Sequence, residues 1–271
     1  MQFDQRMIVR FVLAATVIVA GLVQWLNSGP QTHVPPSVPL PTTTAAPAAP
    51  ATADDERSPV EARREAPASG LPVSQGDFDY YVLVLSWSPT HCSSNAGRGR
   101  DDDMQCRSGR PYGFVLHGLW PQNERGYPQA CDTDQPHEVT AENMARALKI
   151  SPSKDLVQHE WEKHGTCSGL SQDDFFVSEI AAYASVKVPS ADKLPVEPMR
   201  TTPDEVREAF LKENPALMPE NVSATCSRNE LAEIWLCLDK SLQPRACSAE
   251  VRKRHCGARH VRMRAVRGDW P

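Results

Sequence analysis

Two histidine-containing segments carry the side chains with the clearest catalytic potential. The first, FVLHGLWP, places His117 at the end of an apolar run, directly before a glycine and Trp120. The second, HEWEKH, concentrates His159, Glu160, Lys163 and His164 within one short stretch. Imidazoles can take up and release protons near neutral pH, because the ordinary pKa of histidine is about 6.5. An acid, an ammonium and imidazoles in one place would suit proton transfer and the handling of a phosphate.

The second segment is expected to be helical. In a helix, residues four positions apart lie on the same face, so its ionisable side chains form two neighbouring pairs. On a helix His159 stacks with Lys163, and Glu160 stacks with His164 about 100° further round. Zinc helices place two histidines four residues apart, facing one metal ion. His159 and His164 are five residues apart, about 140° round the helix, and this argues against a metalloprotease. Taken alone, the segment equally fits a solvated helix whose charges pair with one another.

The elements that must position these residues follow from apolar periodicity and capping residues. Two strands are expected at 80–87 and 113–119, the second delivering His117 at its end. Helices are expected over 142–148, 154–164, 173–185 and 203–213, with Thr140, Ser171 and Thr202 as their N-terminal signals and Gly165 as a stop. Further strands are expected at 222–226, 231–238, 243–247 and 260–266. This grouping predicts an α+β fold, an antiparallel sheet packed against several helices.

Cysteine usage indicates an oxidising compartment. All eight cysteines follow residue 90, none forms a CxxC pair, and their spacing fits no zinc template. An even count in an apparently exported domain predicts four disulfides, and the residues alone leave about 105 pairings open. Buried free thiols in a cytosolic protein are the lesser alternative.

The amino-terminal third differs in composition from the rest. Arg6 and Arg10 precede an apolar run at 11–26, so residues 1–27 are expected to be a signal peptide or an uncleaved signal anchor, with both possibilities open. Residues 28–76, rich in proline, alanine and threonine, are expected to form a disordered linker. The folded domain is expected over 77–271, in a protein that is periplasmic or secreted, with a single-pass membrane anchor as the open alternative to a removed signal.

The overall charge excludes a uniformly basic nucleic-acid binder. The net charge is −5 and the sequence pI is about 5.9, so any attraction for phosphates must be local. The carboxy-terminal segment 245–271 has eight Lys or Arg against Glu250 and Asp269. Arg262 and Arg264 in this segment fit a phosphate-attracting surface or, equally well, a solvated sheet face.

The two histidine segments together resemble a known family. HGLWP from His117 and HEWEKHGTC from His159 resemble the two active-site segments of the ribonuclease T2 family, which includes bacterial ribonuclease I and plant and fungal acid ribonucleases. Residues 86–89 (SWSP) with Cys92 are similar to the family's first strand, and residues 233–239 (EIWLCLD) to its late strand. The resemblance covers roughly residues 78 to 267.

This resemblance implies an endoribonuclease that cleaves single-stranded RNA. The 2′-hydroxyl of RNA attacks the adjacent phosphorus to give a 2′,3′-cyclic phosphate, and DNA lacks this hydroxyl. By resemblance, His164 is the base, His117 is the acid and His159 binds phosphate, while Glu160 and Lys163 stabilise the transition state. No metal ion or other cofactor is needed, and the enzyme is expected to act as a monomer.

The resemblance also implies a base site and a disulfide pattern. Trp120 and Tyr127 would stack on the base, although plain core packing is the alternative for Trp120. Fungal relatives have a carboxylate where this chain has Gln122, so we expect low base specificity. The family pairing would join Cys92 to Cys106, Cys131 to Cys167, Cys226 to Cys256, and Cys237 to Cys247.

A second function class uses the same scaffold without cleavage. Some relatives act independently of RNA cleavage, so a non-catalytic RNA-binding or signalling protein is the alternative. The intact set of His117, His159, Glu160, Lys163 and His164 argues against it, because a non-catalytic protein has no physical need for two proton-transfer groups and their charged neighbours.

Overall fold

The computed structural model describes residues 70–94, 103–189, 195–268 and 270. The expected signal or anchor at 1–27 and most of the expected linker lie outside the described residues. Residues 63–271 form one unit, which contains both histidine segments. Within the described part of the chain, no helix has the length and apolar character needed to cross a bilayer.

The sheet is built around β1 (Tyr80–Trp87), whose side chains are almost all buried. It pairs antiparallel with β2 (Phe114–Gln122) on one side and with β5 (Glu230–Leu238) on the other. The strand order is β2-β1-β5-β6-β3, and β4 (Val222–Ser227) also pairs with β5. The run of aromatic and branched residues in β1 therefore forms the centre of the sheet, as its composition predicts.

A β-bulge lies at the first histidine. Val84 of β1 pairs with Gly118 and the next residue, Leu85, pairs with Leu116, so His117 has no partner in this register. Bulges bend a strand and redirect a side chain, and they are frequent beside active sites. The expected strand at 113–119 is confirmed, but it extends to Gln122.

The short strands at the sheet edge modify the expected topology. β3 (Met199–Thr201) pairs antiparallel with β6 (Val261–Met263), and β6 meets β5 through one parallel bridge, Glu230 with Arg262. The α+β class is confirmed, with this parallel contact in an otherwise antiparallel sheet.

Two expected strands require correction. The strand at 260–266 is confirmed only over 261–263, and the strand at 243–247 is wrong, since a single bridge from Leu238 to Pro244 replaces it. Proline cannot donate to a strand ladder, and the Asp239 carboxylate accepts hydrogen bonds from the backbone of Ser241 and Gln243, which holds the chain in a turn.

The capping signals place the main helices correctly. Thr140, Ser171 and Thr202 each accept a backbone hydrogen bond at the start of α4 (Ala141–Ala147), α6 (Gln172–Ser185) and α7 (Pro203–Glu213), and the last forms a full capping box. α5 (Lys154–Lys163) ends one residue before His164 and continues as the 3-10 helix η3 (Gly165–Ser168). Four short helices were not expected: α2 (Ser88–Ser93), α3 (Asp103–Cys106), η5 (Pro219–Asn221) and α8 (Ala249–Arg252).

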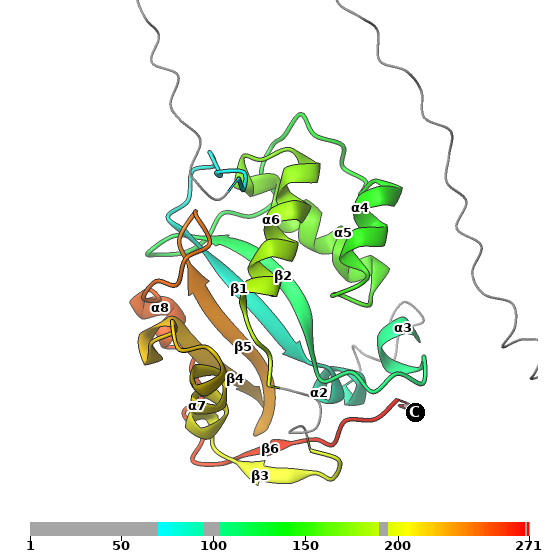
Figure 1. The fold of residues 1–271 in the computed structure, drawn as a ribbon, viewed down its shortest axis with the longest axis vertical. Helices are drawn as coiled ribbons and strands as arrows, with labels where there is room; N and C mark the ends of the chain where they lie inside the picture. The colour runs from blue at the N-terminus through cyan, green and yellow to red at the C-terminus, as the bar shows by residue number, and fades with distance from the viewer. Residues whose placement is uncertain (1–69, 95–102, 190–194, 269, 271) are drawn as a thin grey trace, which may run out of the picture. The chain divides into compact units, whose positions relative to one another are not determined.

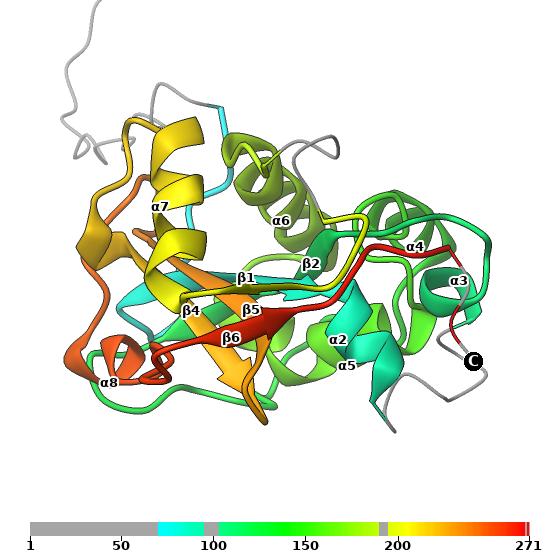
Figure 2. The same cartoon turned by 90° about the horizontal axis from the view of Figure 1, so that it is seen from below.

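The main helices pack against different strands of the sheet. Helices α5 and α6 pack against β2, and α7 packs against β4, as Figure 1 and the turned view of Figure 2 show. Trp161 and Phe175, both fully buried, belong to the main core together with Trp87 of β1. The helix that carries the second histidine segment is thereby held against the strand that carries the first.

All four disulfides join the pairs that the family resemblance implied. They are Cys92–Cys106, Cys131–Cys167, Cys226–Cys256 and Cys237–Cys247. The second of these links η3, which follows α5, to the loop after β2, and in this loop the Ala130 amide donates to the carbonyl oxygen of Lys163 at 2.8 Å. Covalent and hydrogen bonds therefore join the two histidine segments.

Candidate active site

His117 projects from the bulge in β2 between two carboxylates. Its Nδ1 lies 2.6 Å from Oε1 of Glu233 on β5, and its Nε2 lies 3.5 Å from Oε1 of Glu160 on α5. The side chain of His117 is 26% exposed, so substrate can reach it. Two carboxylates beside one imidazole favour its protonated, positively charged form.

Glu160 is buried beneath this histidine and is held by Trp120. The indole Nε1 of Trp120 donates to Oε2 of Glu160 at 2.5 Å. Gly118 provides the room for the carboxylate, because a Cβ at this position would overlap Oε2 of Glu160 and lie 2.8 Å from the Trp120 Nε1. Gly118 is therefore needed because the Glu160 carboxylate lies so close to its backbone, and not because of an unusual backbone conformation.

His164 follows the last residue of α5 and lies on the same tryptophan. Its ring stacks on Trp120 with centroids 5.0 Å apart and 22° between the planes. The His117 ring meets the same indole edge-on, with centroids 5.1 Å apart. The two imidazoles thus converge on one side chain. His164 is almost fully buried, and its Nδ1 has no hydrogen-bond partner within the described part of the chain.

The surroundings drive the two imidazoles to opposite protonation states. Burial favours the neutral form of His117, but hydrogen bonds and charge attraction from Glu160 and Glu233 outweigh it and raise the pKa of His117 to about 10. Burial, assisted by repulsion from Lys163, His117 and His159, lowers the pKa of His164 to about 4 despite the opposing effect of Glu160. Near neutral pH, His117 is therefore protonated and His164 is neutral.

A pocket opens beside His164. Its lining contains both expected base-binding aromatics, the ammonium-bearing Lys163 and a wall from α8; the residues are Trp120, Gln122, Tyr127, Lys163, His164, Trp235, Glu250, Val251 and Arg254. Tyr127 is 47% exposed and its ring lies 6.3 Å from that of His164. One face of Trp120 is occupied by His164, and the rings of Trp120 and Trp235 meet in a T-shaped arrangement with centroids 5.2 Å apart.

Gln122 supports the loop that carries Tyr127. Its buried amide nitrogen donates to the carbonyl oxygen of Gly126 at 2.6 Å. The amide of Gly126 in turn donates to Oε2 of Glu250 on α8 at 2.8 Å. The residue that stands where fungal relatives have a carboxylate therefore engages the protein backbone in this structure.

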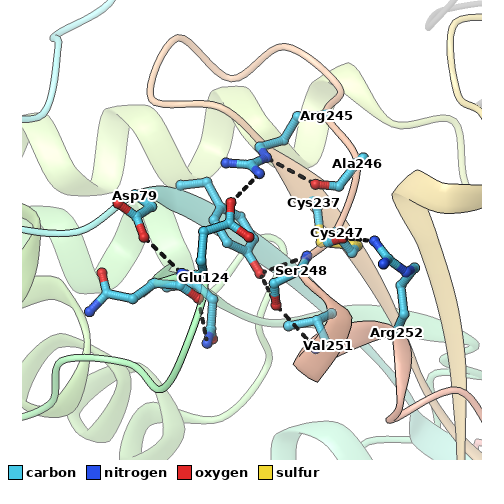
Figure 3. A network of polar contacts seen from close by, with 12 residues as sticks. Asp79, Glu124, Cys237, Arg245, Ala246, Cys247, Ser248, Val251 and Arg252 are labelled. Atoms are coloured by element: carbon cyan, nitrogen blue, oxygen red, sulfur yellow. Dashed lines mark hydrogen bonds and ion pairs between the residues drawn. A yellow bond between two sulfur atoms is a disulfide. The ribbon is translucent and has the colours of Figure 1, made fainter.

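A polar network fixes α8, the wall of the pocket, to the sheet (Figure 3). Ser248 caps α8 and exchanges hydrogen bonds with the Tyr80 hydroxyl of β1. Arg245 lies over the Tyr80 ring at 4.3 Å and pairs with Glu124 at 2.5 Å. The Glu124 amide donates to Asp79 at 2.7 Å, so the loop before Tyr127 belongs to the same network.

The remaining expected residues differ in their burial and in whether they line the pocket. Lys163 is half-buried in the pocket, whereas His159 is exposed on α5. His159 and His164 therefore have different surroundings, as their spacing predicts. Arg264 pairs with Glu230 at 2.7 Å, and Arg262 lies 4.0 Å from the same carboxylate, so part of the basic carboxy-terminal charge is neutralised there.

Sequence reasoning missed several residues of the site. Glu233, Trp235, Glu250 and Arg254 contact or line it, and none was singled out for a role. The available signal was the position of Glu233 and Trp235 inside an otherwise apolar strand, since charged residues are rarely placed in a strand core without a partner.

The chain is similar to ribonucleases in both its sequence and its fold. The model of the ribonuclease T2 family matches residues 78–247. A ribonuclease of Aeromonas hydrophila is 37% identical over 211 residues, covering 71% of this chain and 88% of that protein. A probable ribonuclease of Haemophilus influenzae is 34% identical over 187 residues, covering 65% of this chain and 64% of its own length. Among solved structures, an RNase-related protein from Calystegia sepium shares the fold with a TM-score of 0.54 at 21% identity, covering 70% of this chain and 97% of that one.

Proposed function

The chain belongs to the ribonuclease T2 family and is an RNA-cleaving enzyme, and on this premise we propose that it cleaves single-stranded RNA by 2′-hydroxyl transesterification. His164 takes the proton of the 2′-hydroxyl as its oxygen bonds to phosphorus. His117 gives a proton to the 5′-oxygen as the phosphorus–oxygen bond breaks. The products are a 2′,3′-cyclic phosphate and a free 5′-hydroxyl, so atoms and charge balance without an added reactant.

The observation that carries this proposal is the opposite protonation of two imidazoles on one indole. The pKa of His117 is raised to about 10 and that of His164 is lowered to about 4. With the roles reversed, both groups would be in the wrong protonation state at neutral pH. The assignment of His117 as acid and His164 as base therefore agrees with the electrostatics of the site.

The other charged residues are proposed to act on the phosphoryl group. Lys163 lies in the pocket beside His164, and Glu160 lies beneath His117. A cation and hydrogen-bonding groups near the developing charge lower the barrier most when they are already in place. His159, exposed on the same helix, would contact the phosphate from the rim.

The substrate class follows from the nucleophile and the pocket. RNA carries its own attacking hydroxyl, so the reaction needs no metal ion or other cofactor, and DNA is not cleaved. Trp120 and Tyr127 would hold the base by stacking, which every base permits. Gln122 already donates to Gly126, and this supports low base specificity.

We further propose that the protein is exported and works as a monomer. Four disulfides close one domain, and such bridges persist in oxidising compartments. The segment at 1–27 would be either a removed signal or a single-pass anchor, and determining the mature amino terminus by mass spectrometry distinguishes the two.

The test is cleavage of total RNA by the purified protein in EDTA. We expect fragments with 2′,3′-cyclic phosphate ends, and loss of roughly 10²–10⁴-fold in rate for His117→Ala or His164→Ala. Near-normal cleavage by either variant would overturn the acid–base assignment. Binding of RNA without cleavage by the unaltered protein would instead support the non-catalytic alternative.

A further inference from the structure

Glu233 reaches the proposed acid from the far side of the central strand. It lies on β5 opposite Ser86 of β1, and Ser86 in turn lies opposite Val115 of β2, near the bulge. The Glu233 side chain crosses this width and places Oε1 2.6 Å from Nδ1 of His117. A contact this short across three strands requires both the register and the bulge.

The carboxylate of Glu233 is itself held in place. Its Oε2 accepts a hydrogen bond from the indole Nε1 of Trp235 at 2.8 Å, and its Oε1 accepts one from the Ser86 hydroxyl at 3.5 Å. Burial raises the pKa of Glu233, but the bonds to His117, Trp235 and Ser86 outweigh this and hold the pKa below its ordinary value. Glu233 is therefore an ionised, oriented acceptor.

We propose that Glu233 is a positioning residue for His117, an inference that rests on the proposed role of His117 as the general acid. By accepting a hydrogen bond from the Nδ1–H group, Glu233 fixes the plane of the ring and leaves the Nε2 proton as the transferable one. During cleavage the Nε2–H bond breaks and the 5′-oxygen gains the proton, while the Nδ1 proton stays in the bond to Glu233. A hydrogen-bonded partner that orients a catalytic imidazole in this way stabilises both its tautomer and its charged form.

The charged groups around His117 make the effect of Glu233 measurable. Glu160 of α5 and Glu233 of β5 face the ring and both raise the pKa of His117. His164, whose ring stacks on Trp120, is the neighbouring titratable ring, and charge repulsion couples it in turn to His117, Lys163 and His159. Neutralising Glu233 leaves Glu160 as the single facing carboxylate among these groups, so the pKa of His117 should fall from about 10.

The experiment compares leaving groups in Glu233→Gln and Glu233→Ala enzymes. Uridylyl-3′,5′-adenosine requires protonation of its departing 5′-oxygen, whereas the 4-nitrophenolate of uridine 3′-(4-nitrophenyl phosphate) departs without it. We expect Glu233→Ala to lose roughly 10²-fold in kcat/KM on the dinucleotide, a loss typical of impaired acid catalysis, and little on the aryl ester. Glu233→Gln should show a smaller loss and an alkaline limb of the pH profile moved to lower pH.

The control is Glu230→Gln, a second carboxylate on β5, which pairs with Arg264. It should leave both substrates and the pH profile unchanged. Equal losses on the two substrates would show that Glu233 only maintains the fold and would overturn the inference. Unaltered kinetics in Glu233→Gln, with an unchanged NMR titration of His117, would do the same.

The proposed function has a separate test within this design. His117→Ala should lose activity on the dinucleotide and retain it on the aryl ester. If it does so while the Glu233 variants lose both substrates equally, the acid assignment is supported and only the positioning role fails. If His117→Ala shows no dependence on the leaving group, the acid assignment itself fails.

Discussion

Gly118 lies directly against the carboxylate of Glu160, and a methyl group at this position would occupy the space that Oε2 now fills. This contact joins the strand of the first histidine to the helix of the second. We predict that Gly118→Ala displaces Glu160 and lowers kcat by at least about tenfold, with roughly 1–3 kcal/mol lost in the free energy of unfolding, as is usual for overpacking.

Gly257→Ala is the matched control for that variant, since a Cβ at residue 257 meets nothing within 4 Å. Steady-state kinetics on a dinucleotide and thermal unfolding of both variants provide the comparison. Wild-type kinetics in Gly118→Ala would show that Glu160 can move without consequence for catalysis.

The pH dependence of kcat/KM should be a broad plateau. The base must be neutral, so activity falls as the pH decreases through the pKa of His164, about 4. The acid must be protonated, so activity falls as the pH increases through the pKa of His117, about 10. Initial rates on a dinucleotide, corrected for cleavage without enzyme, measure both limbs. A narrow optimum with limbs one unit either side of pH 6.5 would contradict the pKa shifts of these two residues.

The two aromatic residues of the pocket should differ in kinetic effect. Tyr127 is exposed, so Tyr127→Ala should raise KM by about tenfold, a typical loss for one base stack, with little change in kcat. Trp120→Phe retains a ring against His164 but removes the donor to Glu160. Because a hydrogen bond to a charged group contributes about 1.5–3 kcal/mol, kcat should fall by about tenfold or more. A change in KM alone for Trp120→Phe would show that Trp120 only binds the RNA base and that its hydrogen bond to Glu160 does not affect kcat.

Glu179 is a buried carboxyl group that should make stability depend on pH. Burial and the nearby charge of Glu160 raise its pKa from 4.5 to about 8, against the effect of a hydrogen bond from the Leu119 backbone. The folded state thus holds this proton more tightly than the unfolded state, and its contribution to stability is lost as the pH rises from about 4.5 to about 8.

Glu179→Gln should therefore be more stable than the unaltered protein at pH 8, and the difference should shrink towards pH 4.5. A gain of 1 kcal/mol corresponds to about 2–4 °C in the melting temperature of a domain of this size. Glu208→Gln, an exposed glutamate on α7, is the control and should show no such trend. A melting difference that is constant with pH would indicate that Glu179 does not titrate in this range.

Local patterns were sufficient for much of the fold. The Thr202 capping box, Ser171 before α6 and the apolar run of β1 all form as predicted, because a helix cap or a short apolar run involves residues close to each other along the chain. The prediction of a strand at 243–247 was wrong, because Pro244 and the turn at Asp239 prevent this segment from pairing as a strand.

For the site, the sequence by itself determined which groups were present: three imidazoles, a carboxylate and an ammonium in two motifs that resemble one family. Only the tertiary structure decided how they are charged and held. The bulge at His117, the bond from Glu233 across β1 and the stacking of Trp120 on His164 depend on strand register and helix packing. These contacts join residues as many as 116 positions apart, and the physical reason is that burial and pairing energies act through space, whereas a sequence pattern records only neighbours along the chain.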